Sequence, residues 1–453
     1  MPYDLIDGKI VPREIGPEEA IRRLREESRY LDMQFVDIRG RLQHFTILSY
    51  EFDENSFKNG FPKVDGSSIR GFSDIHESDL IFIPDPATYA RIPWRPGVSR
   101  MIGKIYRNEA RERLPNDTRG IAERLQEHLT GMGMTAMFGP ELEFFVLDEV
   151  KWDVEGGNRQ MYMVASNEAP YSDNPYRLRA KEGYYPVPPM DSLMEYRTQV
   201  SDALFAFGIL PEVHHHEVAA SGQVEINFYM DTLVGASDSI VTLKSVAREI
   251  AKSMGKYATF MPKPIFGDNG SGMHVHISIW DGIGYSLKRN RFYDPSDNYA
   301  ELSQEGRYFV GGLIEHSRSL ASLVAPTTNS YRRLVPGFEA PTFIAWSRGN
   351  RSANIRIPIY RSGNEKEKRI EFRTPDPSCN PYVALSAVLL AGLDGIKRKI
   401  EPGSPIDRSL YELSEAELRE MGVRRLPASL YEAVEELRSD QEYLKPFFSS
   451  ETL

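Results

Sequence analysis

The segment Phe138-Gly-Pro-Glu141-Leu-Glu143-Phe-Phe decides the fold, because it places two glutamates within an otherwise apolar run. Side chains of a β-strand alternate between its two faces, so Glu141 and Glu143 point to the same side. The surrounding phenylalanines predict that this strand is largely buried. Two buried carboxylates repel each other unless a positive charge lies between them, and a divalent cation is the simplest source of that charge.

Two further same-face pairs occur along the chain, His274 with His276 and Glu371 with Arg373. One pair alone is as often the polar face of a half-exposed strand, whereas several pairs in one chain favour a shared site. Carboxylates with an occasional imidazole suit Mg²⁺ or Mn²⁺, and these segments contain no thiol for a cysteine-based zinc site. Paired metals of this kind usually serve phosphoryl transfer. The candidate ligands are Glu141, Glu143, Glu217, Glu225, His274 and Glu371.

Composition and charge limit the class of protein. The chain has 453 residues, enough for two or more domains, and its 41% hydrophobic and 26% charged residues are ordinary for a globular protein. Its net charge of −10 argues against nucleic acid or an anionic membrane as the main partner. The single cysteine, Cys379, excludes an internal disulfide and fits a reducing compartment. No signal peptide or membrane-spanning stretch is evident, so we expect a cytoplasmic protein.

The N-terminal part predicts a small mixed β domain. Residues 17–30 predict a helix, and the following segment predicts two strands around a turn at Arg39-Gly40. Strand and turn signals continue to about residue 105, and a polar joint at 107–118 follows. We therefore place a domain boundary at this joint.

Helices alternate with strands after the joint. Apolar residues at helical spacing predict a helix over 232–254. A second helix begins at Asn380-Pro381, where asparagine is a good N-cap and proline suits the first turn. A third begins at Ser429, with Glu432 three residues later completing a predicted capping box.

Two segments indicate binding of small polar molecules. The glycine-rich segment Phe266-Gly-Asp-Asn-Gly270-Ser-Gly272 is either a hairpin turn or a cradle for a polar substrate, and it lacks the lysine of a P-loop. Guanidinium groups bind carboxylate and phosphate through paired hydrogen bonds and remain charged when buried. The dense arginines after residue 331 therefore indicate an anion site: Arg332, Arg333, Arg348, Arg351, Arg356, Arg361, Arg369 and Arg373.

The order of these motifs resembles that of the glutamine synthetase family, in its bacterial and archaeal type. The likeness extends from about residue 17 to 445. Its blocks are Val64-Asp65-Gly-Ser-Ser68, Phe138-Gly-Pro-Glu-Leu-Glu-Phe-Phe, Glu212-Val-His-His-His-Glu217, Gly222-Gln-Val-Glu225, the segment from Met261 to His276, the segment from Asn329 to Glu339, Asn350-Arg351-Ser-Ala-Asn-Ile-Arg356, and Arg369-Ile-Glu371-Phe-Arg373.

The resemblance implies an α+β fold in two domains. Residues 17–106 would form a β-grasp-like domain that contributes to the neighbouring subunit's site. Residues 107–453 would form a catalytic domain with a curved antiparallel sheet and surrounding helices. A homo-oligomeric ring with sites between subunits follows from the same likeness. The short segment after the last predicted helix weakens the case for a second ring, and Tyr411 is expected to be an ordinary surface or packing tyrosine.

The resemblance also assigns roles to individual positions. Glu143, Glu217 and Glu225 resemble ligands of one metal, and Glu141, His274 and Glu371 those of another. The glutamate site and its closing loop would comprise Arg333, Glu339, Arg373, Asn269 and Gly270. Positions around ATP would be Arg351, Arg356, Arg369, Glu212, His276, Ser278 and Lys366. The ammonium side would comprise Asp65, Ser68 and Tyr184, with Asp65 entering from a neighbouring subunit and Arg351, Glu339 and Asp65 acting in catalysis.

The implied reaction is ATP-dependent ligation of glutamate and ammonium through a γ-glutamyl phosphate, with two or more Mg²⁺ or Mn²⁺ ions in each site. A polyamine or amine ligase of the same fold, and a catalytically silent homologue, are the alternatives. The residues of the ammonium side favour ammonium, and the full set of ligands disfavours a silent protein. Glu212 and Glu217 lie five residues apart, so both serve one site only if their strand ends or bulges near His214–His216.

Overall fold

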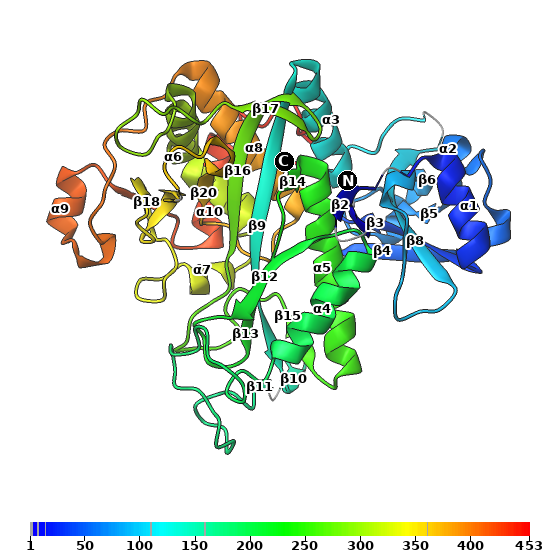
Figure 1. The fold of residues 1–453 in the computed structure, drawn as a ribbon, viewed down its shortest axis with the longest axis horizontal. Coiled ribbons are helices and arrows are strands. Elements are labelled where there is room, and N and C mark those ends of the chain that lie inside the picture. The colour runs from blue at the N-terminus through cyan, green and yellow to red at the C-terminus, as the bar shows by residue number, and fades with distance from the viewer. Residues whose placement is uncertain (1–2, 7–8, 14, 109–110, 158–159, 360) are drawn as a thin grey trace.

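The computed structural model describes residues 3–6, 9–13, 15–108, 111–157, 160–359 and 361–453. Figure 1 shows a small domain, in blue, beside a larger body that the long strands of a central sheet cross from end to end. Helices and sheets occur in both parts, so the expected α+β class is confirmed.

The small domain is built on a mixed sheet of six strands in the order β4-β3-β8-β6-β5, with β7 beside β8. Helix α1 (Pro17–Glu27) buries Ala20, Ile21 and Leu24 against the sheet, which confirms the predicted helix with an earlier end. The predicted turn at Gly40, where φ is +78°, also forms. The other elements of this domain are β3 (Tyr30–Val36), β4 (Leu42–Leu48), α2 (Ser56–Asn59), β5 (Phe61–Asp65), β6 (Asp79–Pro84), β7 (Ala90–Arg91) and β8 (Val98–Arg107). Strands β1 (Tyr3–Ile6) and β2 (Lys9–Pro12) form a separate hairpin, in which the N–H of Tyr3 donates to the carbonyl of Gly208 in the larger body.

The larger body contains an eleven-stranded sheet within the described residues, in the order β12-β13-β9-β16-β20-β19-β18-β21 with β14, β15 and β17 alongside. All its pairs are antiparallel except β18 with β19. The strands are β9 (Met134–Leu147), β12 (Pro211–His216), β13 (Gln223–Phe228), β14 (Asp231–Thr232), β15 (Tyr257–Thr259), β16 (Met273–Ile283), β17 (Ser286–Asn290), β18 (Phe343–Arg348), β19 (Ala353–Ile357), β20 (Ile370–Phe372) and β21 (Arg424–Arg425), and β10 (Glu149–Asp153) and β11 (Met161–Ala165) form a separate hairpin.

Helices surround this sheet, and the predicted helices are present. Asn380 caps α8 by accepting a hydrogen bond from the backbone N–H of Tyr382, and Thr232 caps α5 in the same way through Gly235. The helices are α3 (Thr118–Gly131), α4 (Met194–Ala206), α5 (Leu233–Ser253), α6 (Gln304–Val324), α7 (Ser330–Arg333), α8 (Pro381–Arg398), α9 (Glu415–Glu420) and α10 (Leu430–Ser439). No helix in the described ranges is long and apolar enough to cross a membrane.

The predicted capping box at Ser429 is only half correct. The Ser429 side chain accepts a hydrogen bond from the N–H of Glu432. The Glu432 carboxylate instead accepts from the N–H of Ala428 and pairs with Arg318 of α6. The Glu432 carboxylate is thus engaged by an arginine of another helix and by the N–H of Ala428, in place of the N–H of Ser429.

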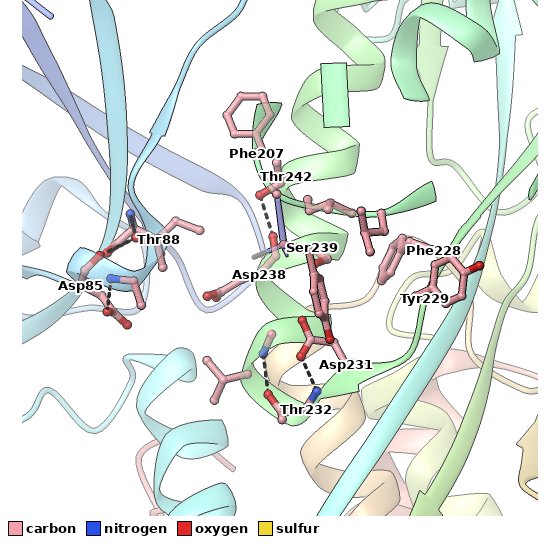
Figure 2. A pocket seen from close by; sticks show the side chains of 18 of the residues that line it. Asp85, Thr88, Phe207, Phe228, Tyr229, Asp231, Thr232, Asp238, Ser239 and Thr242 are labelled. Carbon is pink, nitrogen blue, oxygen red and sulfur yellow. Dashed lines mark hydrogen bonds between the residues drawn. The ribbon is translucent and has the colours of Figure 1, made fainter. Parts of the chain in front are cut away.

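A cavity of about 600 Å³ lies where the small domain meets the larger body. Figure 2 shows Asp85 and Thr88 from the small domain facing Asp238, Ser239 and Thr242 of α5 across it. Beside the cavity the guanidinium of Arg119, only 3% exposed, lies 2.8 Å from Asp85, 2.9 Å from Asp238 and 2.5 Å from Glu123. Arg119 therefore joins α3, α5 and the small domain through buried ion pairs.

We predict that Arg119→Met lowers the free energy of unfolding by about 3–5 kcal/mol, because it leaves buried carboxylates without their cation. Urea unfolding followed by tryptophan fluorescence measures the change. The matched control is Arg438→Met on α10, whose 72% exposed side chain pairs with Glu435 at the surface. Its effect should stay within about 0.5 kcal/mol. Equal destabilisation by the two variants would contradict the role of Arg119.

Candidate active site

Four adjacent strands bring the acidic residues onto one face of the large sheet. Glu225 of β13 lies directly opposite Glu143 of β9, and Glu141 of β9 lies opposite His274 of β16. Glu371 of β20 lies opposite His276 on the other side of β16. Directly opposed residues of neighbouring strands point to the same face. The alternation seen in the sequence therefore forms a continuous acidic surface.

The first group on this face centres on Glu141. Its carboxylate lies 3.2 Å from Nδ1 of His274 and 2.8 Å from Nε2 of His276. Glu371 is 1% exposed and contacts the guanidinium groups of Arg356 and Arg373, the latter at 2.6 Å. Burial would raise the pKa of Glu141, but the two histidines lower it well below its usual range. Burial likewise opposes ionisation of Glu371, yet Arg373 leads the groups that lower its pKa to about 2.

The second group centres on Glu217 and Glu225. Nε2 of His215 lies 3.4 Å from Glu225, and its Nδ1 lies 3.7 Å from Glu217. Burial raises the pKa of Glu217 well above its usual range, and the neighbouring carboxylates of Glu143 and Glu225 raise it further. Burial also raises the pKa of Glu143. This end of the face therefore carries negative charge that the described residues only partly neutralise.

Both groups suit divalent cations. One ligand atom from each of Glu141, His276 and Glu371 lies within 4.8 Å of the others, and the same holds for His215, Glu217 and Glu225. Oxygen ligands with one imidazole fit Mg²⁺ or Mn²⁺, and a cation would remove the repulsion that raises the pKa of Glu217. The first group contains His276 in place of the predicted His274, and the second contains His215 in place of the predicted Glu143. His274 still lies close to both, 3.2 Å from Glu141 and 3.7 Å from Glu143. The predicted ligand sets stay predictions.

A cleft of about 520 Å³ opens onto this face and contains most of the predicted site. Its walls come from β9, β12, β13 and β16, from the segments that follow β11, β18 and β20, and from α7 with the loop after it. The predicted residues that line it are Glu141, Glu143, Glu217, Glu225, His274, Tyr184, Asn269, Gly270, Arg333, Glu339, Arg351 and Arg373.

A tight contact holds Arg333 at one wall of the cleft. Arg333 is 3% exposed and donates to the carbonyl oxygens of Thr374 at 2.9 Å and Arg373 at 3.2 Å. Gly270 packs so closely that an added Cβ would lie 2.5 Å from the carbonyl oxygen of Pro262. The neighbouring Asn269 is buried, and its Oδ1 has no hydrogen-bond partner among the described residues. A buried cation beside an unmatched acceptor suits a ligand that carries both an anionic and a donor group.

A loop that carries Glu339 also lines the cleft. Glu339 is exposed and has φ of +58°, a strained backbone for a residue other than glycine. The hydroxyl of Tyr411 donates to the carbonyl of the next residue, Ala340, at 2.9 Å, in agreement with its expected packing role. Lys181 reaches the same loop and donates to the carbonyl of Gly337 at 2.8 Å. Neighbouring segments thus hold this loop over the cleft.

The remaining predicted residues lie outside the cleft lining. Asp65 and Ser68 belong to the small domain, where the carboxylate of Asp65 accepts from both Ser67 and Ser68 at 2.7 Å. His276, Arg356 and Glu371 adjoin the cleft through Glu141 and Arg373. Lys366 lies on an exposed 3₁₀ turn. Also outside the lining are Glu212, Ser278 and Arg369.

Strand β12 shows the irregularity that the spacing of Glu212 and Glu217 required. Its register with β13 shifts between Pro211 and Val213, and the strand ends at His216. Glu217 therefore turns into the cleft after the strand, while Glu212 stays exposed. The prediction of a strand end near the histidines is confirmed.

Sequence reasoning missed several residues of the cleft. His215 lies two residues before Glu217, and Gln223 lies two residues before Glu225, so alternation alone signalled both. Nε2 of Gln223 donates to Glu143 at 3.1 Å and to the carbonyl of Gly270 at 3.0 Å. Tyr185 stacks on Tyr184 with ring centroids 4.0 Å apart, and no periodic signal marks it.

The chain matches two family models that together span most of its length. Residues 27–108 match the glutamine synthetase beta-Grasp domain, and residues 115–453 match the glutamine synthetase catalytic domain. Glutamine synthetase of Sulfolobus acidocaldarius is 52% identical over 96% of this chain and 92% of its own length. That of Archaeoglobus fulgidus is 45% identical over 90% of this chain and 86% of its own length.

Solved structures give the same result. The cryo-EM structure of Plasmodium falciparum glutamine synthetase superposes with a TM-score of 0.86 at 26% identity, covering 96% of this chain and 93% of that one. A GmaS–ADP complex superposes with a TM-score of 0.78 at 26% identity, covering 96% of this chain and 92% of that one.

We predict that Mn²⁺ raises the melting temperature of the protein by about 2 °C or more, because binding to the folded state alone adds stability. Glu217→Gln combined with Glu225→Gln should reduce this rise to the part that the group of Glu141, His276 and Glu371 supplies. In the presence of EDTA the same double variant should melt above the unmodified protein, since it removes repelling carboxylates. Differential scanning fluorimetry measures both effects. Glu420→Gln, on the exposed end of α9, is the control and should behave as the parent. A rise of equal size in the double variant would contradict the assignment of a metal to this end.

Proposed function

The chain belongs to the glutamine synthetase family, an ATP-dependent group of glutamate–ammonia ligases, and we propose that its acidic cleft is the place of ligation. The substrates are glutamate, ammonium and ATP. The observation that carries the proposal is the shared cleft, because buried arginines and an acidic face meet there within one volume of about 520 Å³.

Glutamate binding is assigned to the wall formed by Arg333, Asn269 and Gly270, with Arg373 beside it. A buried guanidinium is a strong partner for a carboxylate. The unmatched Oδ1 of Asn269 suits the amino group of the same substrate. The carbonyls of Thr374 and Arg373 hold the guanidinium of Arg333, and Gly270 packs closely on the stem of that side chain, so the substrate would meet a preformed site.

Phosphoryl transfer from ATP must precede amide formation, because a carboxylate is a poor electrophile. The arginines Arg351 and Arg356 are assigned to neutralise the charge of the transferring group. Glu141, His274, His276 and Glu371, together with Glu143, His215, Glu217 and Glu225, would hold two divalent cations, Mg²⁺ or Mn²⁺. When bound, these cations supply positive charge for the nucleotide phosphates and the γ-glutamyl phosphate. The GmaS–ADP complex supports the nucleotide assignment, since that similar protein holds ADP.

Amide formation needs a base and a dry site. Ammonium carries no lone pair, so a carboxylate must take its proton, and we assign this step to Asp65 of a neighbouring subunit in a ring. The support is that Asp65 is exposed on the small domain and lies outside the cleft of its own chain. Glu339 on its strained loop is assigned to cover the γ-glutamyl phosphate and keep water away.

We predict that ATP hydrolysis with glutamate and Mg²⁺ depends on ammonium and is not supported by putrescine. Colorimetric phosphate release, compared with a sample without amine, measures this. Arg351→Gln should lower the ammonium-dependent rate by about 10²–10³-fold, as expected for loss of a group that stabilises developing charge. The control Arg332→Gln removes an exposed arginine outside the cleft lining and should retain the parent rate. Phosphate release with putrescine but not with ammonium would place the protein among amine ligases. A failure of every tested amine to support phosphate release would contradict ligation.

We predict that Asp65→Asn and Arg351→Gln complement each other when the two inactive variants are produced in one cell. Each site would combine Asp65 from one subunit with Arg351 from the next, so about one site in four should be intact in random mixtures. Glutamine formation by the co-purified oligomer measures the recovery. As a control, Glu339→Gln with Arg351→Gln should not recover, provided both residues act from the same chain. If the mixture of Asp65→Asn and Arg351→Gln also fails to recover activity, Asp65 does not act in the neighbouring subunit's site.

A further inference from the structure

A second polar cavity, distinct from the acidic cleft, lies on another side of the junction between the two domains. We call it the Lys244 cavity. Its volume is about 660 Å³. Its walls are β3 and β4 of the small domain, the turn between them, the segment around Trp94, and one face of α5. None of the proposed catalytic residues lines it.

Three cations converge on this cavity without a carboxylate partner among the described residues. Lys244 and Arg248 lie one turn apart on α5, and Arg41 approaches from the β3–β4 turn. Lys244 donates to the carbonyl oxygen of Cys379 at 3.2 Å, and Arg248 to that of Lys244 at 3.4 Å. Both acceptors are neutral backbone groups.

The two acids that line the cavity are already occupied. Asp32 accepts hydrogen bonds from Nδ1 of His44 at 2.6 Å and from Thr46 at 2.9 Å. Glu249 lies 3.6 Å from Arg95. The positive charge of Lys244, Arg248 and Arg41 is therefore not balanced from within the cavity.

Lys244 is the most constrained of the three cations. Its side chain is buried, with 6% of the residue exposed. Burial lowers the pKa of Lys244 to about 8, Cys379 and Asp376 oppose this shift, and the nearby Arg248 adds to it. A buried ammonium without a carboxylate is a costly arrangement, and such arrangements usually serve binding.

The turn that carries Arg41 is held in place by the same segment that contacts Lys244. Nδ2 of Asn380 donates to the carbonyls of Asp37 and Ile38 at 3.2 Å and 3.1 Å. An added Cβ on Gly40 would lie 2.7 Å from Cα of Asn380, so only glycine fits this contact. Cys379 thus holds Lys244 through its carbonyl, and the adjacent Asn380 holds the turn that carries Arg41.

We propose that the Lys244 cavity binds a small organic dianion, whose oxyanion group pairs with Arg41, Lys244 and Arg248. One ammonium and two guanidinium groups are the donors that carboxylates and phosphates prefer. The apolar side chains of Leu42, Ile92, Val98 and Val241, with the ring of Trp94, provide a surface for the organic part. A volume of about 660 Å³ also exceeds what a bare inorganic ion would fill. Phosphate monoesters and dicarboxylates share this chemistry.

Such a ligand would connect the small domain to the larger body. It would contact Arg41 on the β3–β4 turn and Lys244 and Arg248 on α5 at once. Because it binds only the assembled arrangement, it should stabilise the full chain against unfolding.

The test is the melting temperature of the full-length protein with glycerol phosphate or succinate, at constant ionic strength. We expect either or both probes to raise it by about 2 °C or more. Arg41→Gln combined with Arg248→Gln should abolish the rise, and both residues are exposed, so the variant should fold. Lys244→Met, which keeps the volume of the buried stem, should do the same. Lys252→Gln is the matched control, because it removes an exposed cation of α5 outside the cavity.

Each result decides the proposal. A rise with one probe only would identify the ligand as a phosphate monoester or as a dicarboxylate. No rise with either probe would overturn the proposal. A rise that persists in Arg41→Gln/Arg248→Gln but disappears in Arg351→Gln would place the anion in the acidic cleft and overturn it as well. The readout does not use catalysis, so its failure leaves the proposed ligase function untouched.

Discussion

The crowding of carboxylates on one face of four neighbouring strands is the constraint on which the site depends. At one end Arg356 and Arg373 pair with Glu371, and Arg373 with His276 lowers the pKa of that carboxyl to about 2, against the opposing effect of burial. At the other end Glu217 faces mainly other carboxylates, and burial together with their charge raises its pKa well above the usual range. The fold therefore retains an electrostatic cost that external cations would relieve, and it does so where the cleft opens.

The local part of this arrangement followed from the sequence. Alternation along a strand placed Glu141 beside Glu143 and His274 beside His276, because a two-residue period depends only on the chain itself. The contact of His215 with Glu225 depends on the register between β12 and β13, and the packing of Gly270 on Arg333 joins residues distant in sequence. Such contacts come from tertiary pairing, which periodicity cannot supply. The capping box at Ser429 failed for the same reason, since Arg318 reaches Glu432 from another helix.

The family resemblance predicted roles that local sequence patterns could not, including one between subunits. It assigned Asp65 to a site that its own chain does not form, and in the structure the Asp65 carboxylate is engaged by Ser67 and Ser68 on the small domain. Asp65 does not line the cleft of its own chain, so the proposed role of Asp65 would be played at the cleft of a second copy. The rigid connection of the small domain through Arg119 matters here, because a displaced domain would present Asp65 at a different angle to any neighbour.

The cleft is built from strands of the sheet and from a strained loop. Charge that must be held at fixed distances comes from β9, β13, β16 and β20, where the ladder fixes each side chain. Glu339, assigned to cover the intermediate, lies on a loop with φ of +58°, a conformation that costs of order 1–3 kcal/mol for a residue other than glycine. Glycine would relieve that strain but would remove the carboxylate. A glutamate in this strained conformation agrees with the proposed role of its side chain, and the hydrogen bonds from Tyr411 and Lys181 to neighbouring carbonyls hold its backbone.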